Sequence, residues 1–330
     1  MSNILNHDVP QKVAIQGAPG SFHHIAASQH FGEDIELICC DTFEEVFRTM
    51  SEDDSVMGLV AIENTIAGSL LHNYDLLREH KCTIVGEHKL RIEHCIACLP
   101  HEGWEDLKEV NSHPVALQQC RHYLSTHPQL KVVEAEDTAG VARRIAEQQL
   151  SGHAAICHAN AATQYGLKVL ANHIEDNKHN FTRFLALADE WQADNYREVH
   201  QTNKSSIVFS LPHEEGSLSQ VLSIFSFYKI NLTKIQSLPI IGREWQYLFY
   251  VDVAYPDYVR YRQSIDAVRP LTRDLRILGE YPAFDDFANK KARNYYLLPT
   301  HSHDYSSTAY RRRTRILLFT QTQRSGTTQR

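Results

Sequence analysis

The chain has 330 residues, 42% of them hydrophobic and 22% charged, which is the composition of an ordinary globular protein with room for two or three domains. Its formal net charge of -7 leaves the chain as a whole without the basic surface that nucleic-acid binding needs. No segment approaches the ~20 apolar residues of a membrane helix, and no basic region precedes an apolar run near the N-terminus, so we expect a cytoplasmic protein that binds small metabolites.

The first half of the chain alternates short apolar runs, turns and helical patterns. The apolar run 13–16 leads through the turn 17–21 into a helix that extends to residue 31, and the run 56–62 leads into a helix at about 69–79. The same order recurs further along, where Pro114 opens a helix at a position suited to proline. Strand, turn and helix in repeated order predict mainly parallel sheets covered by helices.

Two α/β lobes are expected rather than one sheet. The segment 89–99 alternates without an intervening helix, as a crossover between lobes does, and the run 181–188 supplies the return crossing. The sequence therefore predicts a two-lobed domain over 12–188, like that of periplasmic binding proteins, with crossovers near 88 and 181. Its ligand is expected in the cleft, close to strand ends and helix N-termini.

A second, smaller domain is predicted after a polar linker at 189–204. Residues 205–284 show the order βαββαβ of a ferredoxin-like fold, with strands at 206–211, 232–240, 245–254 and 275–281 and helices at 216–228 and 257–268. Residues 285–330 hold a basic cluster among Ser, Thr and Gln, and we expect a disordered tail there. An RNA-binding arm, a localisation signal and a translated out-of-frame end are the alternatives.

Metal and cofactor chemistry have little support in the sequence. The seven cysteines lie in apolar segments and are expected to be reduced core thiols, including the pair Cys95 and Cys98. The 20 histidines lack ligand spacing, and pairs such as His23 and His24 are expected on the surface or in loops. Because no P-loop, HExxH, GxSxG or complete GxGxxG motif is present, we predict neither a metal nor a cofactor.

Two polar motifs carry the functional prediction. In the run 180–184, Thr182 is an uncharged donor, Arg183 can bind a carboxylate through two N–H groups, and the flanking Phe181 and Phe184 would exclude water. Upstream, Asn64 and the residues that follow it stand at the end of a strand, where they either cap a helix or face a crevice. A strand with one exposed Arg and simple helix capping are the structural alternatives.

Five segments in a fixed order resemble the prephenate dehydratase family, in its form with a C-terminal ACT domain, over about 12–284. They are Gly17-Ala18-Pro19-Gly20-Ser21-Phe22, Ile62-Glu63-Asn64-Thr65 with Gly68-Ser69, Ser112-His113-Pro114 with Gln118-Gln119-Cys120, Glu136-Asp137-Thr138, and Asn180-Phe181-Thr182-Arg183-Phe184. About ten residues precede the first strand, so the monofunctional form is expected.

The resemblance implies a reaction and residues to carry it. The family converts prephenate to phenylpyruvate, with loss of carbon dioxide and water, in phenylalanine synthesis. By resemblance, Thr182 donates a hydrogen bond or proton to the departing hydroxyl. Because a threonine hydroxyl is a poor acid, we expect electrostatic stabilisation in a dry cleft rather than full proton transfer. Glu63 is expected to orient its neighbours, and the residues expected to hold the substrate are Asn64, Thr65, Ser112, Gln119, Arg183 and Phe184.

The ACT domain of this family binds phenylalanine as an effector. Candidate effector residues, by the same resemblance, are Gly216, Ser217, Leu218, Asn231, Gln236, Ser237 and Pro239. Where the family commonly has Glu-Ser-Arg-Pro, this chain has Gln236-Ser237-Leu238-Pro239, so two opposite charges are lost together, which need not destabilise the fold. Because isolated ACT domains leave sheet edges that pair readily, we expect a homodimer or homotetramer.

Two alternatives to a prephenate dehydratase stay open. The substrate arogenate differs from prephenate only by an amino group in place of the side-chain keto group. A non-catalytic amino-acid sensor, made of the same cleft and an ACT domain, would be marked by loss of the Thr182 hydroxyl or the Asn64 amide, and both groups are present.

Overall fold

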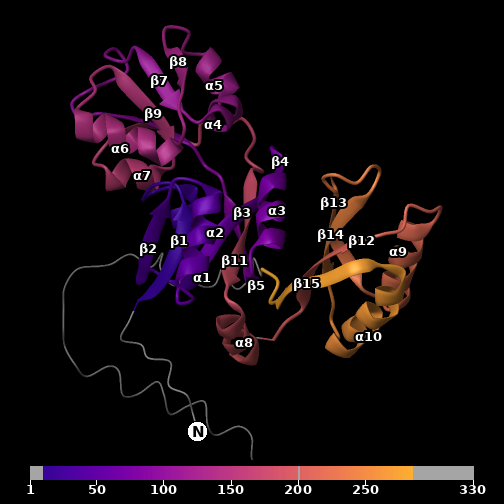
Figure 1. The fold of residues 1–330 in the computed structure, drawn as a ribbon. Coiled ribbons are helices and arrows are strands. Elements are labelled where there is room, and N and C mark those ends of the chain that lie inside the picture. The colour runs from indigo at the N-terminus through magenta and orange to yellow at the C-terminus, as the bar shows by residue number, and fades with distance from the viewer. Residues whose placement is uncertain (1–9, 200, 285–330) are drawn as a thin grey trace, which may run out of the picture. The chain divides into compact units, whose positions relative to one another are not determined.

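The computed structural model describes residues 10–199 and 201–284, and within them the strands form three sheets (Figure 1). The tail predicted at 285–330 lies outside the described residues. Among the helices that are described, each is too short or too polar to span a bilayer.

The first sheet has the strand order β2-β1-β3-β11-β5, with the short β4 paired to β3. β1 runs parallel to β2 and β3, while β11 is antiparallel to β3 and β5. Its elements are β1 (Gln11–Gln16), α1 (Phe22–Phe31), β2 (Ile35–Cys40), α2 (Phe43–Glu52), β3 (Met57–Asn64), β4 (Gly68–Ser69), α3 (Leu71–Glu79), β5 (Thr83–Arg91) and β11 (Phe181–Ala188).

The second sheet has the order β10-β6-β9-β7-β8. The chain enters it between β5 and β6 and returns to the first sheet between β10 and β11, so the predicted two-lobed α/β fold is confirmed. Its elements are β6 (Cys95–Cys98), β7 (Glu109–Ser112), α4 (Pro114–Gln119), α5 (Arg121–Ser125), β8 (Lys131–Glu134), α6 (Thr138–Gln148), β9 (His153–Cys157), α7 (Ala159–Gln164) and β10 (Lys168–Asn172).

The third sheet has the antiparallel order β13-β14-β12-β15, and its elements follow the predicted order βαββαβ. They are β12 (Lys204–Ser210), α9 (Ser217–Phe227), β13 (Asn231–Pro239), β14 (Tyr247–Ala254), α10 (Tyr258–Val268), the 3-10 turn η1 (Arg269–Leu271) and β15 (Arg273–Tyr281). The ferredoxin-like pattern in the sequence is therefore confirmed as a fold.

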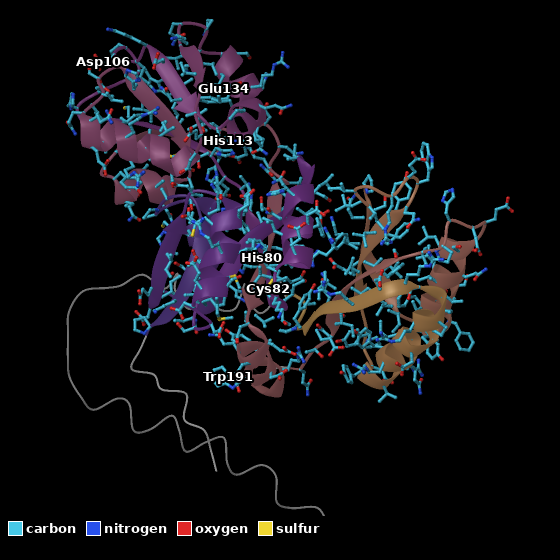
Figure 2. All side chains as sticks on the ribbon, viewed as in Figure 1. His80, Cys82, Asp106, His113, Glu134 and Trp191 are labelled. Carbon is cyan, nitrogen blue, oxygen red and sulfur yellow. The ribbon has the colours of Figure 1, made fainter. Side chains whose placement is uncertain are left out.

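The segment predicted as a polar linker is largely helical. Helix α8 spans Glu190–Val199 and begins where the carboxylate of Asp189 accepts from the backbone N–H of Gln192 (2.7 Å). Ala193 is fully buried, whereas Trp191 is 73% exposed (Figure 2). The apolar contacts of this helix come from few residues, which is why the polar sequence concealed it.

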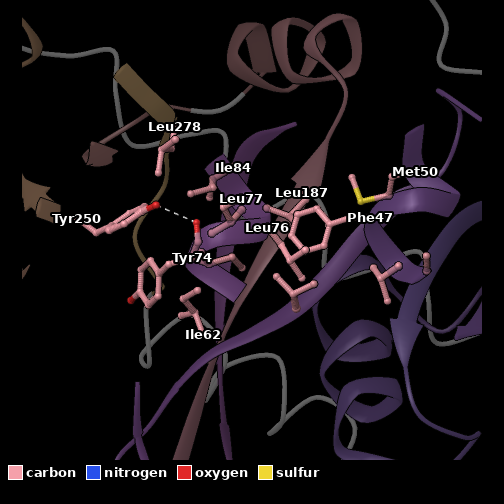
Figure 3. Close-up of a cluster of buried hydrophobic side chains, with 14 of the residues drawn as sticks. Phe47, Met50, Ile62, Tyr74, Leu76, Leu77, Ile84, Leu187, Tyr250 and Leu278 are labelled. Atoms are coloured by element: carbon pink, nitrogen blue, oxygen red, sulfur yellow. Dashed lines mark hydrogen bonds between the residues drawn. The ribbon is translucent and has the colours of Figure 1, made fainter. Parts of the chain in front are cut away.

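The two faces of the first sheet have different neighbours. α1 packs on the face that carries Phe184, whereas α2, α3 and the third sheet cover the opposite face. In Figure 3, Tyr250 and Leu278 of the third sheet pack beside Tyr74, and the Tyr250 hydroxyl donates to the Tyr74 carbonyl (3.0 Å). Gly279 permits this close packing, because a Cβ there would clash with the Ile84 carbonyl of β5. The third sheet is thus packed directly against strands of the first.

The cysteines are free thiols, and five of the seven are buried as predicted. Cys82 is half-buried and Cys39 is exposed, so the expectation of a core position was wrong for Cys39. Cys39 lies on β2, the strand at one edge of the first sheet.

Candidate active site

A cavity of about 470 Å³ lies between the lobes built on the first and second sheets. The first lobe contributes the carboxyl ends of β1 and β3 and the starts of α1 and α2, and the second lobe contributes the starts of α4 and α6. β11, which returns from the second lobe, contributes Thr182 and Phe184. The predicted cleft is therefore present, with strand ends and helix N-termini at its wall.

Helix N-termini supply the cavity with anion-binding character. The N-cap residues Ser21, Thr42 and Asp137 of α1, α2 and α6 all line it, as does His113 of α4. The first N–H groups of a helix have no intrahelical partner and carry partial positive charge, which favours carboxylates. The N-caps of α1, α2 and α6 all accept from their own helices, through the Ser21 hydroxyl, the Thr42 hydroxyl and the Asp137 carboxylate. The first turn of α2 also holds Glu44 and Glu45, so α1, with a neutral cap and no acidic residue in its first turn, is the best site for a ligand anion.

The hydroxyl of Thr182 has a defined role in the hydrogen-bond pattern. The side-chain oxygen of Asn64, Oδ1, accepts from the backbone N–H groups of Ile66 (2.9 Å) and Ala67 (2.8 Å), which fixes the orientation of the side-chain amide. Its Nδ2 therefore faces Thr182 and donates to Oγ1 (3.0 Å). Because the Thr182 oxygen accepts from Asn64, its own proton is left to donate to a ligand in the cavity.

The same network continues to His94 and fixes its tautomer. Asn64 Nδ2 also donates to Asn180 Oδ1 (2.8 Å), so the Asn180 amide donates onward to Gln119 Oε1 (2.9 Å). Gln119 Oε1 is 3.0 Å from Nε2 of His94, which must carry the proton. Burial lowers the pKa of His94, so the ring is neutral, and its buried Nδ1 is an acceptor with no partner among the described residues.

The side chains around the cavity are neutral or acidic. Of the described residues that line it, none is Lys or Arg, whereas Asp41, Glu44, Glu136 and Asp137 are carboxylates. Burial lowers the pKa of His23 to about 4, so this ring is also neutral at physiological pH. No group of three metal-ligating side chains occurs within 10–199 and 201–284. Binding of a dianion must therefore rest on hydrogen-bond donors and helix N-termini.

Four of the predicted site residues line the cavity: Thr182, Asn64, Gln119 and Phe184. Arg183 does not. Its guanidinium points to the opposite face of β11, where it bonds Glu87 (2.6 Å), Asp252 and the Tyr281 hydroxyl. Successive strand residues point to opposite faces, so Thr182 and Arg183 cannot both face one cavity. The prediction that Arg183 binds a carboxylate of the substrate in this cavity was therefore wrong.

Ser112 and Thr65 also lie outside the cavity lining. The Ser112 hydroxyl is fully buried and donates to the carbonyl of Ile156 (2.7 Å), which ties β7 to β9. The Thr65 hydroxyl donates to the carbonyl of His179 (3.1 Å) and accepts from the N–H of Phe181. Both hydroxyls are hydrogen-bonded to backbone groups near the site. The sequence pattern could not distinguish such structural bonds from contacts with a substrate.

Two cavity residues, His23 and His94, were missed or misjudged from the sequence, and so was Asn180, which is buried in the hydrogen-bond network that ends at His94. His23 was expected at the surface or in a loop, but it lies in α1 and lines the cavity, where its ring contacts Phe184. His94 and Asn180 belong to segments that were recognised only as a crossover and as part of a motif. A histidine at the end of an extended crossover, between two strands that bound a cleft, is the signal that would have identified His94.

The candidate effector residues lie at the start of helix α9 and on strand β13 of the third sheet. Gly216, with φ +81, precedes α9, Ser217 and Leu218 begin that helix, and the others lie on β13, which pairs only with β14 in the described sheet. Leu238, where the family commonly has Arg, is 7% exposed and packs into the core shared with the first sheet.

The matching family model and two curated relatives name one enzyme family. The family model of prephenate dehydratase matches residues 13–192. Arogenate dehydratase 1 of Petunia hybrida is 38% identical over 293 residues, covering 84% of this chain and 68% of that protein. The bifunctional chorismate mutase/prephenate dehydratase of Aquifex aeolicus is 34% identical over 276 residues, covering 82% and 73%.

A solved structure agrees with these relatives. Prephenate dehydratase from Arthrobacter aurescens, in complex with L-Phe, is 25% identical with a TM-score of 0.72, covering 86% of this chain and 98% of that one. The matched region includes the cavity and both strands that hold Asn64 and Thr182. The chain therefore belongs to the prephenate dehydratase family.

Proposed function

We propose that the chain catalyses the decarboxylating dehydration of prephenate to phenylpyruvate, carbon dioxide and water. The observation that carries the proposal is the Thr182 hydroxyl, whose oxygen accepts from Asn64 and whose proton is free to donate into the cavity. As the ring carboxylate leaves as carbon dioxide, its bonding electrons enter the ring and the ring hydroxyl departs. With one proton from solvent, that hydroxyl becomes water and the ring becomes aromatic.

In this reaction the protein has mainly to position the substrate and to stabilise the negative charge that develops on the departing oxygen. A hydrogen bond from Thr182 to the departing oxygen strengthens as negative charge develops there, so it stabilises the transition state more than the bound substrate. Phe184 and Phe22 in the cavity wall limit water around that oxygen, which strengthens the hydrogen bond. The N-terminus of α1, whose first turn holds no acidic residue, is the proposed site for a substrate carboxylate.

Arogenate is the second candidate substrate, and the charge of the cavity favours it. Four carboxylates line the cavity without a Lys or Arg among the described lining residues, so the ammonium group of arogenate would offset part of their repulsion. Nδ1 of His94, which has no partner among the described residues, would accept a hydrogen bond from an ammonium group that reached it, whereas a keto oxygen has no proton to donate to it.

We further propose that the βαββαβ unit is an ACT domain that binds phenylalanine as an effector. The related prephenate dehydratase from Arthrobacter aurescens was solved in complex with L-Phe, which supports this proposal. The start of α9 and strand β13 would form that site. β13 is an edge strand in the described sheet, which supports a homodimer or homotetramer formed through it. Loss of two charges at Gln236 and Leu238 predicts weaker effector binding than in relatives with the common motif.

The test is turnover by the purified protein on prephenate and on arogenate, each with and without phenylalanine. Formation of phenylpyruvate or phenylalanine, abolished in the folded Thr182→Val variant, supports the dehydratase. Folded wild-type protein that turns over neither substrate yet binds phenylalanine would overturn it in favour of an amino-acid sensor.

A further inference from the structure

Side chains of the third sheet bind Arg183, the residue that follows Thr182 on β11. Arg183 is 9% exposed, and of its three guanidinium nitrogens one bonds Glu87 of β5, while the other two bond Asp252 of β14 and Tyr281 of β15. Two of the three partners of Arg183 thus come from the third sheet. The backbone of β11 is anchored to that sheet one residue after Thr182.

This contact is a buried and electrically balanced cluster. Lys204 of β12 donates to both oxygens of Glu87 (2.9 and 2.7 Å), and the Ser206 hydroxyl donates to Asp252 (2.6 Å), so two cations face two carboxylates. Although burial opposes ionisation, the charges of Arg183 and Lys204 lower the pKa of Glu87 to about 2. Buried ion pairs rarely add stability over apolar packing of equal volume, so their value here lies in the geometry they impose.

The third sheet also holds the side chains beside Asn64. Lys234 of β13 lies 2.9 Å from the Glu63 carboxylate and donates to the Ser69 hydroxyl (2.9 Å). Glu63 directly precedes Asn64 on β3, and Ser69 pairs with Glu63 across the β3–β4 ladder. The side chain of Lys234 is 10% exposed and that of Glu63 is 38% exposed, so this contact is partly shielded from water.

Thr182 and Asn64 stand opposite each other where the sheet is irregular. They are register partners across β3 and β11, but the register shifts between Arg183 and Phe184, one residue further along. A bulge of this kind disrupts the ladder locally and re-aims side chains. Support from outside the ladder is therefore needed at this point to keep the Asn64 amide 3.0 Å from the Thr182 oxygen.

We propose that Asp252 and Lys234 of the third sheet are positioning residues for the dehydratase reaction, which hold Thr182 and Asn64 in their reactive geometry through Arg183 and Glu63. The inference rests on the proposed function for its kinetic test. It assigns the third sheet a part in catalysis itself, in the absence of any effector.

The variants are Asp252→Asn, which keeps the shape and the Ser206 contact, and Lys234→Met, which keeps the length of the side chain. Lys12→Met is the matched control, because it removes a cation from an ion pair with Asp53 (3.1 Å) in the same lobe and away from the cavity. Each positioning variant should lower kcat about tenfold and change KM less than about twofold, as expected when a catalytic group is displaced without loss of substrate contacts. The control should change neither.

A double-mutant cycle separates positioning from a general weakening of the fold. With Thr182→Val as background, Lys234→Met should lower kcat no further, since the hydroxyl it positions is gone. Equal losses of kcat in the wild-type and Thr182→Val backgrounds would overturn the proposal, as would a lower Tm with unchanged kcat.

A measurement that needs no turnover tests the geometry directly. The methyl resonance of Thr182, assigned by its loss in Thr182→Val, should shift in Asp252→Asn and Lys234→Met and stay unchanged in Lys12→Met. Unchanged Thr182 resonances in both variants would refute the positioning role. If the wild type turns over neither substrate while these shifts occur, the proposed function fails and the structural coupling stands.

Discussion

Glu87→Gln gives the sharpest quantitative test of the buried charge cluster. In the wild type, the Glu87 carboxylate accepts from Arg183, from Lys204 and from the backbone N–H of Phe284 (3.0 Å). The substitution keeps the size of the side chain and removes its charge. Two buried cations then face only Asp252, and breaking one partner of a buried ion pair is expected to destabilise the fold by about 3 kcal/mol at neutral pH.

The pH dependence of that destabilisation follows from the pKa of Glu87. The ordinary value is 4.5 and the folded value is about 2, which is a difference of about 2.5 pH units or about 3 kcal/mol. Because the folded pKa is lower than the unfolded one, the stabilisation is complete above about pH 4.5 and is lost as pH falls toward 2. About 2 kcal/mol of it should disappear between pH 5 and pH 3.

The measurement is the free energy of unfolding in urea at pH 7, 5, 4 and 3 for the wild type and Glu87→Gln. The gap between the two proteins should be constant down to about pH 5 and then narrow by about 2 kcal/mol by pH 3. Asp53→Asn is the matched control: the Ser55 hydroxyl and backbone N–H and the Lys12 ammonium also lower the pKa of Asp53 to about 2, but that carboxylate is exposed to solvent. The part of its effect that comes from the charge of Lys12 should vanish in about 0.5 M salt, whereas the effect of Glu87 should persist. A gap that stays constant from pH 5 to pH 3 would refute the reasoning.

Three further outcomes are expected. Thr182→Val should reduce turnover at least ~100-fold with little change in stability, because Asn64 keeps two other acceptors; near-normal kcat in steady-state assays would exclude its catalytic role. Ser112→Ala should cost about 1 kcal/mol of unfolding free energy through the lost bond to Ile156 and leave KM unchanged, and a raised KM would restore it as a substrate contact. His23→Gln should remove the part of the acid destabilisation that falls between about pH 6.5 and pH 4, where the unfolded chain takes up a proton and the buried ring does not; an unaltered stability profile in urea would contradict this.

Much of the architecture was readable in the sequence. Alternation of apolar runs, turns and helical patterns predicted the two lobes and the βαββαβ order, because these patterns report local backbone geometry and one-sided burial. The helix at 190–199 was missed because its buried face rests on few residues in a polar segment. Cys39 was misplaced because an apolar neighbourhood does not show which strand lies at the edge of a sheet.

For the site, the sequence identified the motif residues but not the direction in which each side chain points. Thr182, Asn64, Gln119 and Phe184 do line the cavity, since the end of β3, the first half of β11 and the end of α4 converge there. Arg183 was assigned to the same cavity by its place in the motif, although a strand sends neighbouring side chains to opposite faces. Two of its three partners on that face, Asp252 and Tyr281, come from the third sheet.

The sequence by itself determined the fold class, the order of the elements and the family motifs, because these depend on short-range periodicity and on residue types at fixed spacing. Only the tertiary structure decided that Arg183 meets Asp252 and Glu87, and that His94 ends a hydrogen-bond chain from Thr182. These contacts join residues that are 25 to 118 positions apart, and the sheets must pack before such groups have partners. Their hydrogen bonds and charges are therefore properties of the packed molecule.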